Sequence, residues 1–181
     1  MSKTIQLNRN LYNTLNNTIR KNNIKLFHVG INLHVINKDS EKFQIEVINP
    51  KRFLNFLEKN WKTSYKNEDY DTHHNLVKIK KEVHNVYRKE ITLKMKQKVR
   101  LEYSHGCTKY ETKNMTYNIG FNPIKQYGWF EIYADNDSSY YSEGGLWFKE
   151  NSLCDYDGIF SLPFEIQEQL EKWGLDTSYL D

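Results

Sequence analysis

Cysteine, proline and glycine are scarce in this chain of 181 residues, which contains 2 Cys, 3 Pro and 8 Gly. The two cysteines, Cys107 and Cys154, are too few for a disulfide framework and lack the paired spacing of metal ligands. The low proline and glycine content argues against long linkers or disordered stretches. No apolar run approaches the length of a membrane span, and the first residues do not form a secretory signal. We therefore expect a folded cytoplasmic protein with no membrane partner.

The sequence motifs of the common enzyme classes are also missing. There is no glycine-rich phosphate loop, nucleophile elbow or dinucleotide fingerprint. The remaining candidates for metal ligands are two Asp-x-Asp pairs and two neighbouring histidines, Asp135/Asp137, Asp155/Asp157 and His73/His74. Turns and surface loops account for the same residues without a metal. We therefore expect a protein without enzymatic activity or cofactor, and a metal-dependent nuclease is the alternative.

Aromatic and charged residues are abundant, and the charges are unevenly distributed along the chain. The 13 Tyr, 9 Phe and 4 Trp can build a core although aliphatic residues are few. Residues 1–115 contain 23 Lys and Arg against 11 Asp and Glu, whereas residues 116–181 contain 3 against 12. This split suits a protein that meets a nucleic acid on one side and a basic protein surface on the other. Mutual neutralisation, within one monomer or across a homodimer, is the alternative.

The most informative pattern is an alternation of apolar and cationic residues, with a period of two, between Ile91 and Tyr103. Because successive side chains of a strand point to opposite faces, the apolar positions 91, 93, 95, 99, 101 and 103 form a core face. The other face then carries a row of four cations, Lys94, Lys96, Lys98 and Arg100. Adjacent like charges repel, so this row needs solvent, acidic groups or an anionic partner to offset it.

Other cations near this strand in the sequence are Lys78, Lys80, Arg88 and Lys89. Together with the row they predict a track for the phosphates of RNA or DNA, which gives affinity without sequence readout. A solvated sheet face, whose lysines discourage pairing with other strands, is the alternative.

The remaining patterns predict an α+β fold, mainly an antiparallel sheet with N-terminal, central and C-terminal helices. Asn8 caps a first helix that ends near residue 22, and strands at 26–35 and 43–47 form a hairpin around a turn at 37–40. Asn49 and Pro50 open a helix in which Phe53, Leu57 and Trp61 share a face. Residues 62–75 predict a surface loop and a boundary between an N-terminal unit, 1–75, and a second unit, 76–181. One compact domain is the alternative.

In the second half, residues 76–103 predict two long strands with a break within 82–88, or a helix over 80–90. Further strands are expected at 115–121, 129–134 and 146–148, with turns at 136–138, 144–145 and 155–158. Pro163 begins a last helix, and Gly174 ends it.

Acidic and aromatic residues are concentrated in the last third of the chain. Tyrosine and tryptophan beside carboxylates make good anchors on a basic protein surface. The predicted partner-binding residues are Asp135, Asp137, Tyr140, Tyr141, Glu143, Asp155 and Asp157. A solvated acidic face over an aromatic core explains the same residues.

Two segments of this last third resemble small proteins of phages and mobile elements, a group that includes anti-CRISPR inhibitors. They are residues 142–148, SEGGLWF, and residues 155–163, DYDGIFSLP. The resemblance implies a compact, non-enzymatic protein that inhibits a bacterial defence nuclease ribonucleoprotein by occupying it, foremost a type II, single-protein RNA-guided CRISPR effector. The basic face would then suit guide RNA or DNA, and the acidic face would suit the positively charged channel of the effector. A plain RNA- or DNA-binding module is a further alternative.

Overall fold

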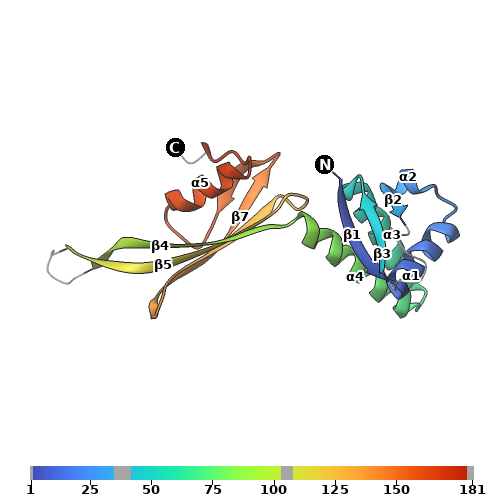
Figure 1. Ribbon diagram of the computed structural model, residues 1–181, viewed down its shortest axis with the longest axis horizontal. Helices are drawn as coiled ribbons and strands as arrows, with labels where there is room; N and C mark the ends of the chain where they lie inside the picture. The colour runs from blue at the N-terminus through green and yellow to red at the C-terminus, as the bar shows by residue number, and fades with distance from the viewer. Residues whose placement is uncertain (1, 35–41, 103–107, 179–181) are drawn as a thin grey trace. The chain divides into compact units, whose positions relative to one another are not determined.

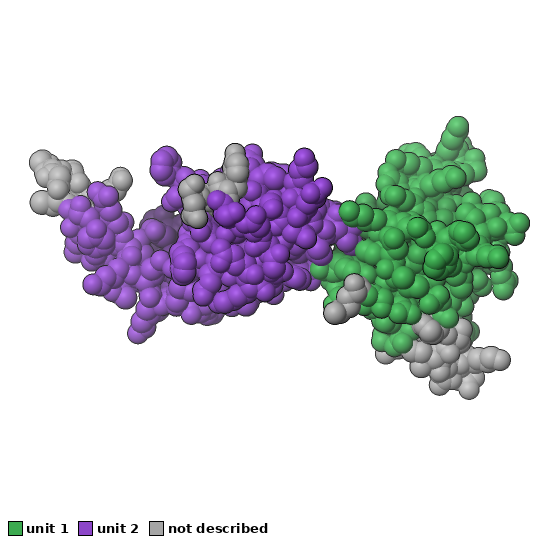
Figure 2. Space-filling model, turned by 90° about the horizontal axis from the view of Figure 1, so that it is seen from above, with its two compact units in different colours: residues 1–87 green, residues 88–181 purple. Residues whose placement is uncertain are grey.

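The computed structural model describes residues 2–34, 42–102 and 108–178, and it divides into two compact units, Met1–Tyr87 and Arg88–Asp181 (Figure 2). Each unit combines helices with its own antiparallel sheet, which confirms the predicted α+β class. The boundary between the units in the sequence falls between Tyr87 and Arg88, whereas it was predicted at residue 75. Within the described residues, no helix has the length and apolar character needed to cross a lipid bilayer.

Unit 1 is a three-stranded sheet with the strand order β1-β3-β2, combined with four helices (Figure 1). Its elements are β1 (Lys3–Asn8), α1 (Arg9–Lys21), α2 (Leu26–Val29), β2 (Ile31–His34), β3 (Lys42–Val47), α3 (Pro50–Lys66) and α4 (Tyr70–Tyr87). Two asparagines begin helices as predicted. Asn8 Oδ1 accepts a hydrogen bond from the Leu11 amide at 2.9 Å, and Asn49 Oδ1 accepts one from the Arg52 amide at 3.0 Å.

The largest correction in unit 1 concerns residues 62–87, which form the end of α3 and the whole of α4 in place of a loop and a strand. Leu76, Ile79 and Val83 are fully buried, and their spacing is that of one helix face. The polar start of α4 is attached to α3, because the His73 ring nitrogen Nδ1 lies 3.0 Å from the Trp61 carbonyl oxygen. Lys78 and Lys80 therefore belong to a helix, and the alternation around Ile79 was misleading.

Two further predictions for unit 1 need correction. Residues 26–29 form the short helix α2, which ends at Gly30 with φ +84°, so only β2 and β3 form the predicted hairpin. Strand β1, which pairs with β3, was not predicted. The predicted turn at 37–40 lies outside the described residues.

Unit 2 is a five-stranded antiparallel meander with the order β4-β5-β6-β7-β8. Its elements are β4 (Lys89–Glu102), β5 (Thr108–Asn122), β6 (Tyr127–Ala134), β7 (Asp137–Lys149), β8 (Ser152–Tyr156) and α5 (Phe164–Lys172). Helix α5 packs on one face of this sheet, where Ile166 and Leu170 join Ile119, Phe130 and Leu146 in the core (Figure 1). We call the opposite face of the sheet the open face.

The expected strands at 115–121, 129–134 and 146–148 and the last helix are confirmed. The expected turns at 136–138 and 155–158 overlap the start of β7 and the end of β8, and the expected turn at Gly144 and Gly145 is wrong. Both glycines lie inside β7, where they pair with Phe130 and Trp129 of β6. A Cβ atom on Gly144 would lie 2.1 Å from the Asp157 carbonyl oxygen and 2.6 Å from the Phe130 ring, and one on Gly145 would lie 2.7 Å from the Trp147 ring. Glycine is therefore needed here for the close approach of backbone and aromatic rings and not for a turn.

A polar contact holds the core-facing side of β4. Gln97 is the one polar residue among the core-facing positions 91–99, and its amide donates to Glu165 of α5 at 3.0 Å. Its carbonyl oxygen accepts a hydrogen bond from the Tyr117 hydroxyl of β5. Burial is the main cause that raises the pKa of Tyr117 to about 12, so this phenol stays protonated and remains a donor.

Candidate nucleic-acid interface

Strand β4 has the two-faced character that its sequence predicts. Val99 is buried, and Ile91, Leu93 and Met95 are partly buried against the core. The even-numbered positions 92–100 are all exposed. The side chains of Lys94, Lys96, Lys98 and Arg100, which we call the cationic row, therefore lie on the open face. The side chain of Leu101 and the whole of Tyr103 lie outside what the structure describes.

The neighbours of the cationic row on β5 are neutral. Residues paired across an antiparallel ladder share a face, and the row pairs as Lys94↔Thr116, Lys96↔Asn114, Lys98↔Thr112 and Arg100↔Tyr110. The carboxylate that approaches this ladder belongs to Asp135, which accepts a hydrogen bond from the Thr116 hydroxyl at 2.8 Å. The side chain of Glu102, two positions after Arg100, lies outside what the structure describes. Among the side chains that are described, none forms an ion pair with any member of the row. The repulsion within the row is therefore left to solvent or to an external anion.

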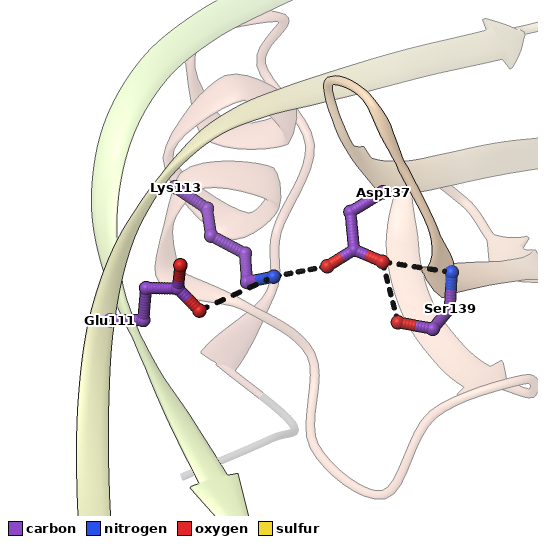
Figure 3. A network of polar contacts seen from close by, with 4 residues as sticks. All are labelled: Glu111, Lys113, Asp137 and Ser139. Atoms are coloured by element: carbon purple, nitrogen blue, oxygen red, sulfur yellow. Dashed lines mark hydrogen bonds and ion pairs between the residues drawn. The ribbon is translucent and has the colours of Figure 1, made fainter.

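On the opposite face of the same hairpin, the cation Lys113 has acidic partners (Figure 3). Lys113, whose side chain is 15% exposed, forms an ion pair with Asp137 and lies 3.6 Å from a Glu111 carboxylate oxygen. Asp137 also accepts hydrogen bonds from the amide and hydroxyl of Ser139. The hydrogen bond from Lys113 is the main cause that lowers the pKa of Asp137 to about 2. Where this sheet neutralises a lysine internally, it uses a dedicated acidic partner.

The other four predicted phosphate contacts are not part of the row. Lys80 lies over the Trp61 ring of unit 1, with 4.8 Å between Nζ and the ring centroid, and Lys78 is on the same helix. Lys89 donates to the Trp173 carbonyl at 3.2 Å. Arg88 forms an ion pair with Glu90 and lies over the Trp129 ring. The structure thus brings together four of the eight cations, and it gives Lys80, Arg88 and Lys89 internal contacts.

One residue of this interface was missed by sequence reasoning. Tyr110 is 62% exposed and stands directly across from Arg100 on the open face. An exposed aromatic ring beside cations is the arrangement on which single-stranded nucleic acids stack their bases. The signal for Tyr110 was the pairing register of β4 with β5, which one sequence does not reveal.

The predicted partner-binding residues do not form one patch. Tyr141, Glu143 and Asp155 share the open face, since they pair with Tyr133, Glu131 and Trp147 respectively. Tyr140 lies on the α5 side, where it adds to the raised pKa of Tyr117. Asp137 is occupied by Lys113, Asp135 accepts from Thr116, and Asp157 accepts a hydrogen bond from the Gly145 amide at 2.5 Å.

Metal coordination has little support in this geometry. Across residues 2–34, 42–102 and 108–178, no three His, Cys, Asp or Glu side chains come close enough together to hold a metal ion. The two Asp-x-Asp pairs belong to unit 2 and the His73/His74 pair to unit 1. The nuclease alternative therefore has no assembled site among these residues.

Comparison with known proteins found no matching family model, no matching curated protein and no matching solved structure. The resemblance to anti-CRISPR inhibitors stays a prediction.

Proposed function

We propose that this protein binds nucleic acid through the cationic row on the open face of β4. The observation that carries the proposal is a set of four consecutive outward cations that face neutral β5 residues and have no ion-pair partner among the described residues. Alternate residues of a strand are about 6.6 Å apart, so the row extends over about 20 Å. At 3.4 Å per stacked nucleotide, that length matches about six nucleotides of one strand.

The proposal predicts a specific dependence on salt. Four phosphate contacts give a slope of log affinity against log salt of about −2.8 for single strands and −3.6 for duplex DNA. Raising salt from about 50 to 200 mM should therefore weaken single-strand binding by about 50-fold. Fluorescence anisotropy with a labelled oligothymidylate of about 12 nucleotides would measure this slope.

The decisive variant replaces all four residues of the row with glutamine, Lys94→Gln, Lys96→Gln, Lys98→Gln and Arg100→Gln. At about 0.1 M salt we expect a loss of affinity of about 500-fold, because the counterion-release contribution disappears. The matched control removes four exposed lysines elsewhere, Lys51→Gln, Lys66→Gln, Lys125→Gln and Lys149→Gln, and should retain most of the affinity. Equal losses in both variants would show that net charge, and not the row, attracts the oligonucleotide.

The narrower proposal is a phage-type inhibitor of a bacterial defence nuclease, foremost a type II, single-protein RNA-guided CRISPR effector. It is supported by the resemblance at residues 142–148 and 155–163, and by carboxylates on the same open face as the cationic row. A nucleoprotein offers both phosphates and a basic channel to such a face. In this function the protein occupies the effector or its guide RNA and catalyses nothing.

Cleavage assays test the narrower proposal. A type II effector loaded with guide RNA should lose target cleavage when the protein is added, and the four-glutamine variant should inhibit much less. Uninhibited cleavage by each effector tested at excess protein would contradict this function while leaving nucleic-acid binding intact. Cleavage of RNA or DNA by the protein alone, abolished by a chelator, would instead favour the metal-dependent nuclease.

A further inference from the structure

The open face of unit 2 contains a cavity of about 480 Å³, which lies away from β4, toward the edge of the sheet formed by β8. It lies on β6 and β7 and on the segment that follows β8. The residues that matter for its chemistry are Tyr127, Trp129, Glu131, Glu143 and Asp157. We call it the acidic–aromatic cavity.

Two of its carboxylates lie side by side on neighbouring strands. Glu131 and Glu143 are directly paired on neighbouring strands, an arrangement of like charges that is destabilising. The Asn118 amide donates to Glu131 Oε2 at 3.1 Å, and the Tyr141 hydroxyl donates to Glu143 Oε2 at 2.6 Å. Among the described residues no donor contacts the second oxygen, Oε1, of either group. Both carboxylates are therefore oriented, and each keeps an oxygen for a cationic ligand.

The aromatic wall is held close to the backbone by glycines. The Trp129 ring occupies the space that a Cβ atom of Gly120 would need, and the Trp147 ring does the same at Gly145. Tyr127 and Trp147 are 36% and 40% exposed, and their rings meet edge to face with centroids 5.6 Å apart. Trp129 is thus positioned by Gly120, and Tyr127 is supported by Trp147, which neighbours the cavity but does not line it.

An independent observation indicates the kind of cation. The Arg88 guanidinium carbon lies 5.7 Å from the centroid of the Trp129 ring, and the same guanidinium is paired with Glu90. A planar guanidinium on an aromatic ring beside a carboxylate is thus a contact that this sheet already makes at the margin of the cavity.

We propose that the acidic–aromatic cavity binds an arginine side chain of a basic protein partner. A guanidinium can donate to two carboxylates at once, whereas an ammonium group offers only a point charge. The Tyr127 ring is the aromatic surface left for it, because Arg88 already lies over the Trp129 ring. Phosphate is excluded as the ligand because Glu131, Glu143 and Asp157 would repel it. The inference therefore does not depend on nucleic-acid binding by the cationic row, and it deepens the narrower proposal, in which this face meets a basic protein channel.

The test uses the full chain and no nucleic acid, with the capped peptide Gly-Gly-Arg-Gly-Gly as the probe. Nuclear magnetic resonance would follow the tryptophan indole N–H signals during titration. We expect saturable shifts with the arginine peptide. Replacement of arginine by citrulline, its neutral analogue, should lower the affinity by about tenfold or more. The double variant Glu131→Gln/Glu143→Gln should lose affinity by about tenfold or more.

The matched control is Glu150→Gln/Glu168→Gln, which changes the net charge equally at exposed positions outside the cavity. It should bind the peptide as the unaltered chain does. Thermal unfolding provides the second measurement, because removal of two opposed charges should leave unit 2 at least as stable. Absence of a saturable shift with the unaltered chain, or equal affinity in the two double variants, would overturn the proposal.

Discussion

The two sides of the open face, one on β4 and the other on β6 and β7, carry charges of opposite sign. On the β4 side, four cations stand in a row opposite neutral residues, and the described residues give them no ion-pair partner. On the β6–β7 side, carboxylates stand between aromatic rings and form the acidic–aromatic cavity. Both sides keep like charges together, in contrast to the α5 side, where Lys113 and Asp137 neutralise each other. The comparison shows that this sheet pairs opposite charges at Lys113 and Asp137 and at Arg88 and Glu90, and that the described side chains offer no such pair to the cationic row.

The largest effect is expected from a substitution in the core of unit 2, because this core supports both sides of the open face. Phe130 is almost completely buried beneath the sheet, so Phe130→Ala should lower the free energy of unfolding of unit 2 by about 3–5 kcal/mol. Urea denaturation followed by circular dichroism would measure it. Affinity for the oligonucleotide and for the arginine peptide should then fall together as unit 2 unfolds. Loss of one with full retention of the other would indicate that the two surfaces do not depend on one sheet.

A second variant sharpens the contrast on the β4 side. Tyr110→Ala should weaken binding of an oligothymidylate by about 1–3 kcal/mol, because a base loses its stacking partner. Affinity for duplex DNA, whose bases are already stacked, should change little. Tyr110→Phe keeps the ring and is the matched control in the same anisotropy assay. An equal effect of Tyr110→Ala on both nucleic acids would assign the tyrosine to general surface contact.

A third variant addresses the β6–β7 side alone. Gly120→Ala places a Cβ atom against the Trp129 ring, and overpacking of this kind costs about 1–3 kcal/mol or displaces the ring. We expect weaker binding of the arginine peptide and unchanged affinity for the oligonucleotide, each measured by titration of the folded variant. If oligonucleotide affinity falls as well, the two surfaces are coupled.

The smallest effect concerns the internally neutralised pair. The pKa of Asp137 is lowered from 3.8 to about 2, so its carboxylate contributes stability that is present above the unfolded pKa. This contribution should be lost as the pH falls from about 4 to 2, and it should be modest because the group is accessible to water. Thermal unfolding of Asp137→Asn should show a weaker dependence on pH in that range. Asp155→Asn, which alters a carboxylate without an ion pair among the described residues, should keep the original dependence.

Local chemistry explains what the sequence predicted well. The caps Asn8 and Asn49, and the alternation in β4, depend on neighbours within a few positions, and each matches the structure. The alternative of a helix over 80–90 covered the end of α4, but its first half was missed because its polar first turns resemble a loop. The alternation of Val77 and Ile79 with Lys78 and Lys80 also imitates a strand.

Pairing between strands accounts for most of what the sequence could not supply. The positions of Tyr110 beside Arg100 and of Glu131 opposite Glu143 depend on register across turns. The glycines of β7 looked like a turn because the groups that need the space at Gly144, the Phe130 ring and the Asp157 carbonyl, belong to other segments of the chain. Tertiary packing therefore decided both the nucleic-acid interface and the cavity.

The contacts of Gln97 have a consequence for misfolding. A shift of β4 by one residue against β5 would turn every side chain of the strand over and drive the lysines into the apolar interior. In the observed register Gln97 contacts both Tyr117 and Glu165, and the one-residue shift would turn its amide to the open face, away from both. The shifted register would therefore be destabilised in two ways: lysine ammonium groups would be buried in the apolar interior, and both hydrogen bonds of the Gln97 amide would be lost. Gln97 thus helps to exclude this misfolded hairpin.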